Sequence, residues 1–243
     1  MFFNLIFRKG VLRMRWTWRL MIVGCLLLVT ACSKGEATSS TQKLELEADK
    51  LTKLVIDNRN GEIEVSGADT DTIEVTAVVT AKGISMDKLK LKLRAEGAAA
   101  YLDASFGSQM LAMGSGAVDL VITLPRELAV EVDSHRDGKL KVADLSAPLE
   151  VDNVNGDLEV IDTKGPVTLS NRDGDITVRN IETDVNIHNI NGHIAVTQVE
   201  GSVEAAVGDG SLELDHISGD AVISQTGNGE IKLGAIGGNV SRK

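Results

Sequence analysis

Hydrophobic and polar positions repeat with a constant period over residues 133–243. An Asp-Gly or Asn-Gly pair returns every 18 or 19 residues. Both residue types tolerate positive φ angles, so each pair indicates a tight turn. A period kept over so many repeats predicts that successive repeats lie on one another. The turn glycines are Gly138, Gly156, Gly174, Gly192, Gly210 and Gly229.

Apolar residues hold fixed places in each repeat. They stand two, four, seven, eleven and thirteen residues after the glycine, which for Gly174 gives Ile176, Val178, Ile181, Val185 and Ile187. Short alternation is the period of a strand, so each repeat predicts two strands joined by an apolar corner. A chain of local hairpins would alternate too, but it would need no constant period. We therefore expect an all-β fold, a right-handed parallel β-solenoid (β-helix) of about 18 residues per coil.

Two polar columns accompany the apolar ones. Asn153, Asn171 and Asn189 stand three residues before successive glycines, where stacked amides can bond one another and the turn backbone. The residue just before the glycine alternates between Asp and Asn, which keeps like charges two coils apart. We interpret both columns as structural. A row of calcium sites is the alternative, and the turn Gly208-Asp209-Gly210 comes nearest to it.

Residues 44–132 do not keep the period. Asn58-Arg59-Asn60-Gly61 looks like a turn of the repeat and predicts a first, irregular coil. Longer alternating stretches follow at spacings typical of antiparallel hairpins. We expect a small, partly antiparallel β region that caps the solenoid of residues 133–243. The alternating stretches are Ile73 to Val79, Leu89 to Leu93, Tyr101 to Phe106 and Val118 to Leu124.

Residues 1–31 have the pattern of an export signal. A basic segment precedes the twelve mostly apolar residues 20–31, which are too few to span a bilayer comfortably and are typical of a secretory signal peptide. A start at Met14 instead of Met1 would give a more usual signal length.

The signal ends in Val29-Thr30-Ala31-Cys32, which resembles the lipobox of bacterial lipoproteins. This resemblance implies lipidation at Cys32 and attachment to a membrane without a spanning helix. An ordinary signal peptide with a chance cysteine is the alternative. By resemblance to sorting rules, Ser33 implies the outer membrane. The small polar residues of 32–43 predict a flexible tether.

Charge excludes two classes of partner. Five of the 25 Lys and Arg residues lie in residues 1–31, which hold no acid, so the other 212 residues carry 20 basic and 35 acidic side chains, a net charge of −15. Nucleic acid demands a basic surface, and so does an anionic lipid surface. We therefore expect no nucleic-acid partner.

Candidate chemistry is sparse. The sequence contains no HExxH, GxSxG or Walker motif, and we expect no catalytic residue, metal or cofactor. His188 and His193 flank one turn, and we interpret them as solvated side chains rather than a metal pair. Polysaccharide-active enzymes also use β-helices, but they build clefts from long loops, whereas these repeats are nearly minimal.

Four segments resemble one known family: DNRNGEIEV, VDLVITLPRELAVEV, VDNVNGDLEV and LSNRDGDITV. Together with the lipobox they are similar to the bacterial β-strand-repeat family labelled "putative adhesin", a domain of unknown function, over about residues 50–240. The resemblance implies a β-helix-like fold and a place in the cell envelope. It supplies no catalytic or binding residues.

We therefore expect a non-catalytic, lipid-anchored envelope protein that acts as an adhesin or binds an envelope glycan or protein. A periplasmic structural or signalling-associated scaffold is the first alternative, and a glycan-active enzyme is the second. Charged residues near the turns are the candidate surface contacts: Arg136, Lys139, Arg172, Asp173 and Asp175.

Overall fold

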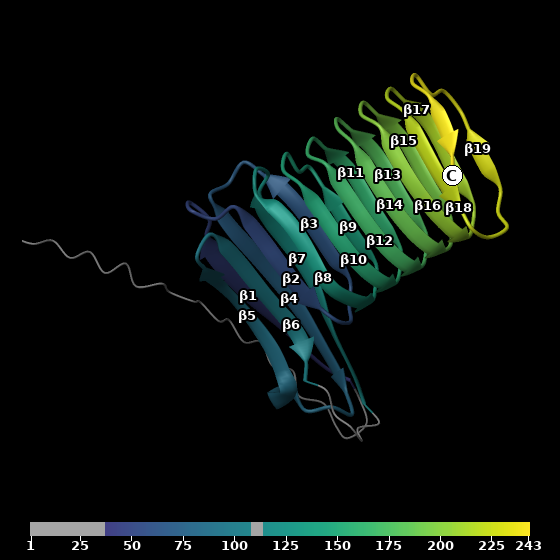
Figure 1. The fold of residues 1–243 in the computed structure, drawn as a ribbon. Coiled ribbons are helices and arrows are strands. Elements are labelled where there is room, and N and C mark those ends of the chain that lie inside the picture. Colours follow the sequence, from purple (N-terminus) through teal and green to yellow (C-terminus); the bar gives the residue numbers. More distant parts are fainter. Residues whose placement is uncertain (1–36, 108–113) are drawn as a thin grey trace, which may run out of the picture.

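Two ten-stranded β-sheets lie face to face and enclose one continuous hydrophobic core (Figure 1). The computed structural model describes residues 37–107 and 114–243. Apart from strands it contains a short 3-10 helix, η1 (Met86–Lys88). The predicted signal peptide and Cys32 lie outside the described residues. In the described part, no helix is long and apolar enough to cross a membrane.

Each repeat contributes one strand to each sheet. The strands that follow the turn glycines lie in the first sheet: β9 (Leu140–Ala143), β11 (Leu158–Thr163), β13 (Ile176–Ile181), β15 (Ile194–Val199), β17 (Leu212–Ile217) and β19 (Ile231–Leu233). The remaining repeat strands lie in the second: β8 (Ala129–Asp137), β10 (Leu149–Asn155), β12 (Val167–Asp173), β14 (Val185–Asn191), β16 (Val203–Asp209), β18 (Ala221–Gln225) and β20 (Val240–Arg242).

Neighbouring coils pair in parallel with an offset of one repeat. Leu158 lies beside Ile176 in the first sheet, and Leu149 lies beside Val167 in the second. Identical columns of the sequence therefore become rows of neighbouring side chains. This confirms the parallel β-solenoid of about 18 residues per coil, and the expected right-handed course stays a prediction.

The predicted apolar columns face the core. Along β13 and β14 burial alternates, with Ile176, Val178 and Ile187 at 0% exposure and polar neighbours pointing outward. The core is filled by Val, Ile, Leu and Ala, whose small, branched side chains suit the narrow space between two sheets. A strand period of two therefore sorts the residues of each coil between core and solvent.

The apolar corner depends on a column of residues in the left-handed region. They stand six residues after each glycine and have φ between 54° and 61°: Asp144, Asp162, Asn180, Gln198 and His216. Asp and Asn adopt this conformation more readily than most residues. The bend places the next side chain in the core, as at Ile181 and Val199. The sequence analysis missed this column.

The N-terminal region extends the same two sheets with these elements: β1 (Thr38–Glu47), β2 (Lys53–Asn58), β3 (Ile63–Ala68), β4 (Thr72–Lys82), β5 (Leu89–Glu96), β6 (Ala99–Phe106) and β7 (Ser115–Pro125). Strands β2 and β3 form the predicted first coil, paired in parallel with β8 and β9. Antiparallel pairs lie at the outer end, where β4 joins β1 and β7, and β5 joins β6.

The predicted partly antiparallel character of this region is confirmed, but it is not the whole pairing, and one other expectation is wrong in part. Strands β6 and β7 also pair in parallel with β2 and β3, so they continue the stack instead of forming only hairpins. The tether expected over residues 32–43 is too long, because residues 38–43 belong to β1. That strand covers the free edge of β4 with a ten-residue antiparallel ladder.

Candidate functional site

The turn glycines stack in one line along the molecule. Gly138, Gly156, Gly174 and Gly192 have φ between 124° and 144°, a region that favours glycine. An ideal Cβ on Gly174 would come within 3.0 Å of the backbone carbonyl of Gly156. Side chains are thereby excluded, and successive turns lie directly on one another. Around each stacked glycine, a segment runs from three residues before the glycine to one residue after it. We call these segments together the turn edge.

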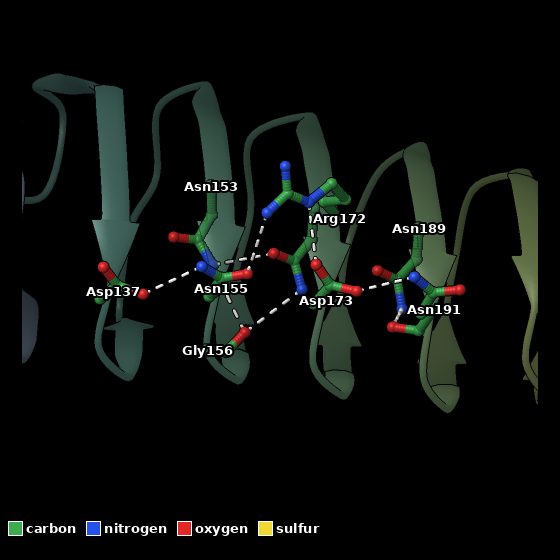
Figure 2. Close-up of polar contacts among 9 residues, drawn as sticks. Asp137, Asn153, Asn155, Gly156, Arg172, Asp173, Asn189 and Asn191 are labelled. Atoms are coloured by element: carbon green, nitrogen blue, oxygen red, sulfur yellow. Dashed lines mark hydrogen bonds and ion pairs between the residues drawn. The ribbon is translucent and has the colours of Figure 1, made fainter.

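Buried asparagines line the inner side of the turn edge (Figure 2). Asn153, Asn171 and Asn189 are at most 2% exposed. Asn153 Nδ2 donates to Asn171 Oδ1 at 2.9 Å, and Asn171 Nδ2 donates to the Gly156 carbonyl at 3.2 Å. Asn189 Nδ2 bonds the Gly174 carbonyl at 2.9 Å. The amides thus satisfy turn carbonyls that would otherwise be buried without partners.

His135 continues this inner column, which the sequence analysis missed. Its side chain is fully buried, and Nε2–H donates to the Gly61 carbonyl at 2.9 Å while Nδ1 lies 2.7 Å from Asn153 Oδ1. The signal was present, because His135 stands three residues before Gly138 as each asparagine does before its own glycine. The residue therefore has a structural partner on each side.

The outer side of the turn edge carries the alternating Asp and Asn residues. Asn155 Nδ2 donates to Asp137 Oδ1 at 2.9 Å, and Asn191 Nδ2 donates to Asp173 Oδ1 at 2.7 Å (Figure 2). Arg172 joins them, with Nε bonded to Asp173 at 2.8 Å and Nη2 to Asn155 at 3.4 Å. The bonds from Arg172 and Asn191 hold the pKa of Asp173 below its ordinary value.

The candidate surface contacts differ in whether their side chains already bond to other parts of the protein. Asp175 Oδ1 accepts the backbone N–H of His193 at 2.8 Å, so it braces the next coil. Lys139 lies 3.4 Å from Glu159 in an exposed ion pair. Arg136 forms no ion pair within the described ranges and is exposed. The turn edge therefore combines an internally bonded polar row with one exposed arginine, Arg136, that forms no ion pair in the described residues.

A row of acids crosses the outer face of the second sheet. Asp57 pairs in register with Asp103 on one side and with Asp133 on the other. Burial raises the pKa of Asp57 above its ordinary value, and the carboxylates of Asp103 and Asp133 raise it further, against the opposing effect of Arg59. The sequence analysis missed this row, since its three members come from distant segments.

Asp57→Asn should stabilise the protein slightly at about pH 7. Because the pKa of Asp57 is higher in the folded protein than in the unfolded chain, ionisation of this acid opposes folding. The stability that the protonated acid contributes is present below its pKa in the unfolded chain, 3.8, and is lost as the pH rises through its pKa in the folded protein. Because the side chain is only partly buried, solvent screens the effect, and we expect a gain of only about 0.5 kcal/mol. Urea unfolding should show this gain at about pH 7 and none at about pH 3. Asp152→Asn, on β10 and separated from Asp57 by strand β8, is the control, and an equal gain there would contradict the cause given.

Metal ligation finds no support in the described part of the chain, where no group of three or more His, Cys, Asp or Glu side chains is placed to hold an ion. His193 Nδ1 lies 2.7 Å from Ser211 Oγ on the neighbouring coil. His188 points outward from β14, in the other sheet. The two histidines that flank this turn are thus directed to different surroundings.

Comparison with known proteins gives a family and distant structural likenesses. The chain is similar to a "putative cell adhesion protein" from Clostridium sporogenes, at 12% identity and a TM-score of 0.37, covering 84% of this chain and 100% of that one. It is also similar to a "putative lipid binding protein" from Parabacteroides distasonis, at 12% identity and a TM-score of 0.39, covering 84% and 96%. The comparison with curated proteins found no match. The model of the Toastrack DUF4097 family matches residues 51–239, and the chain therefore belongs to that family.

Proposed function

We propose that this protein is a non-catalytic, lipid-anchored envelope protein that binds an envelope glycan or protein along the turn edge. One observation supports the proposal above the others. The outer polar side chains form a straight row in which identical positions recur at the strand spacing of about 4.8 Å. A ligand that itself repeats, such as a polysaccharide, can contact several coils at once, and these contacts reinforce one another.

The row keeps hydrogen-bonding capacity for a ligand. An asparagine amide has two N–H donors, and Asn155 and Asn191 each use one of them along the ladder. The ladder bonds also fix the side-chain conformations before binding. A ligand would therefore meet groups that have already lost their rotamer freedom, which lowers the entropic cost of association.

Arg172→Gln should weaken polymer binding about fivefold to tenfold, because the guanidinium supplies the charge in the middle of the row. The measurement is sedimentation of the full-length chain with peptidoglycan and with a panel of envelope polysaccharides. Thr177→Ala, on the outer face of the first sheet, is the matched control. Unchanged binding in the arginine variant, or no binding to any polymer or envelope protein fraction, would contradict the proposal.

Cys32→Ala should release the protein from the membrane fraction, because acyl chains on this cysteine would supply the attachment. Cell fractionation of the wild type and the variant measures this release. Protease treatment of intact cells then separates two locations. Digestion of the wild type favours adhesion at the surface, whereas protection until the outer membrane is opened favours a periplasmic scaffold. A variant that stays with the membranes would contradict lipid anchoring.

The acidic row keeps a glycan-active enzyme as the second candidate. Asp57 pairs in register with Asp103 and Asp133 on strands spaced about 4.8 Å apart, which is near the carboxyl separation of about 5 Å in retaining glycosidases, and the pKa of Asp57 is raised, as that of a general acid is. Release of reducing ends from the same polysaccharides tests it. Turnover that Asp57→Asn abolishes would favour the enzyme over the binding protein.

A further inference from the structure

A pocket of about 570 Å³ opens where the turn edge meets the N-terminal β region. It lies between the turn that joins β2 to β3 and the adjoining ends of β4, β6 and β7. Its size is within the range of pockets that hold a small organic ligand. Its lining includes Arg59, Asn60, Thr80, Phe106, Gly116 and Arg136.

Two arginines line the pocket, Arg59 in the turn after β2 and Arg136 near the end of β8. Arg59 and Arg136 lie side by side, since the backbone N–H of Arg136 donates to the Arg59 carbonyl at 3.1 Å. Both side chains are exposed, and neither forms an ion pair within the described parts of the chain. Arg59 attracts the Asp57 carboxylate without forming an ion pair. In a protein whose residues beyond 31 carry a net charge of −15, the two adjacent guanidinium groups still form a local site for an anion.

The nearest acid in the pocket wall is already engaged. Asp137 Oδ1 accepts the amide of Asn155 at 2.9 Å. In the amide orientation that satisfies its hydrogen bonds, Asn60 donates to Asp137 Oδ2 at 3.1 Å. Both carboxylate oxygens therefore have amide partners instead of arginine partners. The two guanidinium groups are left to bind an external oxyanion.

The pocket lining also includes apolar groups, among them an aromatic ring. Phe106 lies against Gly116, where an ideal Cβ would come within 3.0 Å of the ring carbons, so the glycine makes room for the ring. Phe106 and Tyr101 are the two aromatic residues beyond residue 31. The hydroxyl of Thr80 and the amide of Asn60 add polar groups to the lining. A ligand suited to the pocket has an anionic group, hydroxyls and a face of C–H groups.

We propose that the pocket binds an acidic sugar unit, with its carboxylate or phosphate on Arg59 and Arg136 and its ring against Phe106. This inference rests on the proposed binding of an envelope polymer and names the chemistry of the unit that is recognised. Paired guanidinium groups suit either oxyanion, because each presents parallel N–H donors. The row of the turn edge would then contact the units that follow.

Calorimetric titration of the full-length chain with glucuronate, glucose 6-phosphate and glucose tests the pocket. We expect saturable binding of one or both acidic sugars with a Kd of about 1 mM and none of glucose. Preference between the first two identifies the oxyanion. Arg59→Gln and Arg136→Gln should each weaken binding about tenfold or more. Arg179→Gln, an exposed arginine on β13, is the matched control and should bind as the wild type does.

Three results would overturn the inference: acidic sugars that bind no better than glucose, arginine variants that bind normally, or an equal loss in the Arg179 control. Melting curves of each variant separate lost binding from lost folding. Failure here together with intact polymer binding would refute the pocket alone. Binding of the acidic sugars without any polymer binding would refute the proposed function and leave the pocket.

Discussion

Gly174→Ala is expected to destabilise the protein by about 4 kcal/mol, through two effects that act together. The φ angle of 136° at Gly174 is unfavourable for any residue with a Cβ. The added methyl group would also meet the Gly156 carbonyl, which is held in the adjacent turn. Neither turn can move without breaking the hydrogen bonds that Asn171 and Asn189 make to these glycines.

Gly97→Ala is the matched control for this substitution. Gly97 has a positive φ of 64°, but no atom lies within 4 Å of an added Cβ. Replacing Gly97 with Ala should lower the free energy of unfolding only through the unfavourable φ angle, by about 1–2 kcal/mol. Urea unfolding of both variants measures the difference. Equal losses would show that the carbonyl contact does not exclude side chains from the turn.

Ile176→Asp is expected to cost at least about 5 kcal/mol, which is comparable to the whole stability of many domains. The side chain is fully buried between Leu158 and Ile194 on the neighbouring strands. A carboxylate there would lose its hydration, and among the described residues no Lys or Arg side chain is buried to compensate it. Both the loss of apolar contacts and the unpaired charge oppose folding.

Thr177→Asp separates burial from the effect of adding a charge to β13. Thr177 is the next residue and points outward, so its replacement should change stability by about 0.5 kcal/mol or less. Thermal unfolding followed by circular dichroism compares the two variants. An unchanged midpoint for Ile176→Asp would mean that this column does not face the core. Hydrogen exchange should locate the loss in the coils around β13, because each coil contacts only its neighbours.

Local patterns were enough to predict the repeat. Alternation around Ile176 and Val178 identifies the inward face, and the Asx-Gly pairs fix the turns, because both signals are contained within one coil. The stacked asparagines were predictable for the same reason. The column that contains Asp144 was not predictable in this way. Gln198 and His216 have the same positive φ angle in that column, although neither residue type is typical of the left-handed region.

Pairing between distant segments could not be predicted from the sequence. Asp57 meets Asp103 and Asp133 only because β6 and β8 lie on the two sides of β2, and no local pattern encodes that order. The same holds for the pocket, where Arg59 and Arg136 are neighbours in space but 77 positions apart in the chain. Residues 38–43 looked like a tether because small polar residues also suit an edge strand such as β1.

Because neighbouring coils pair at a constant offset, each coil is an equivalent unit that can be removed or added. Removal of residues 156–173 would join Asn155 to Gly174, which regenerates an Asn-Gly turn and returns every later side chain to the same face. The rod would shorten by one strand spacing, about 4.8 Å, with its cross-section intact. Gene duplication or loss of one unit can therefore change the length of the rod without redesigning the core.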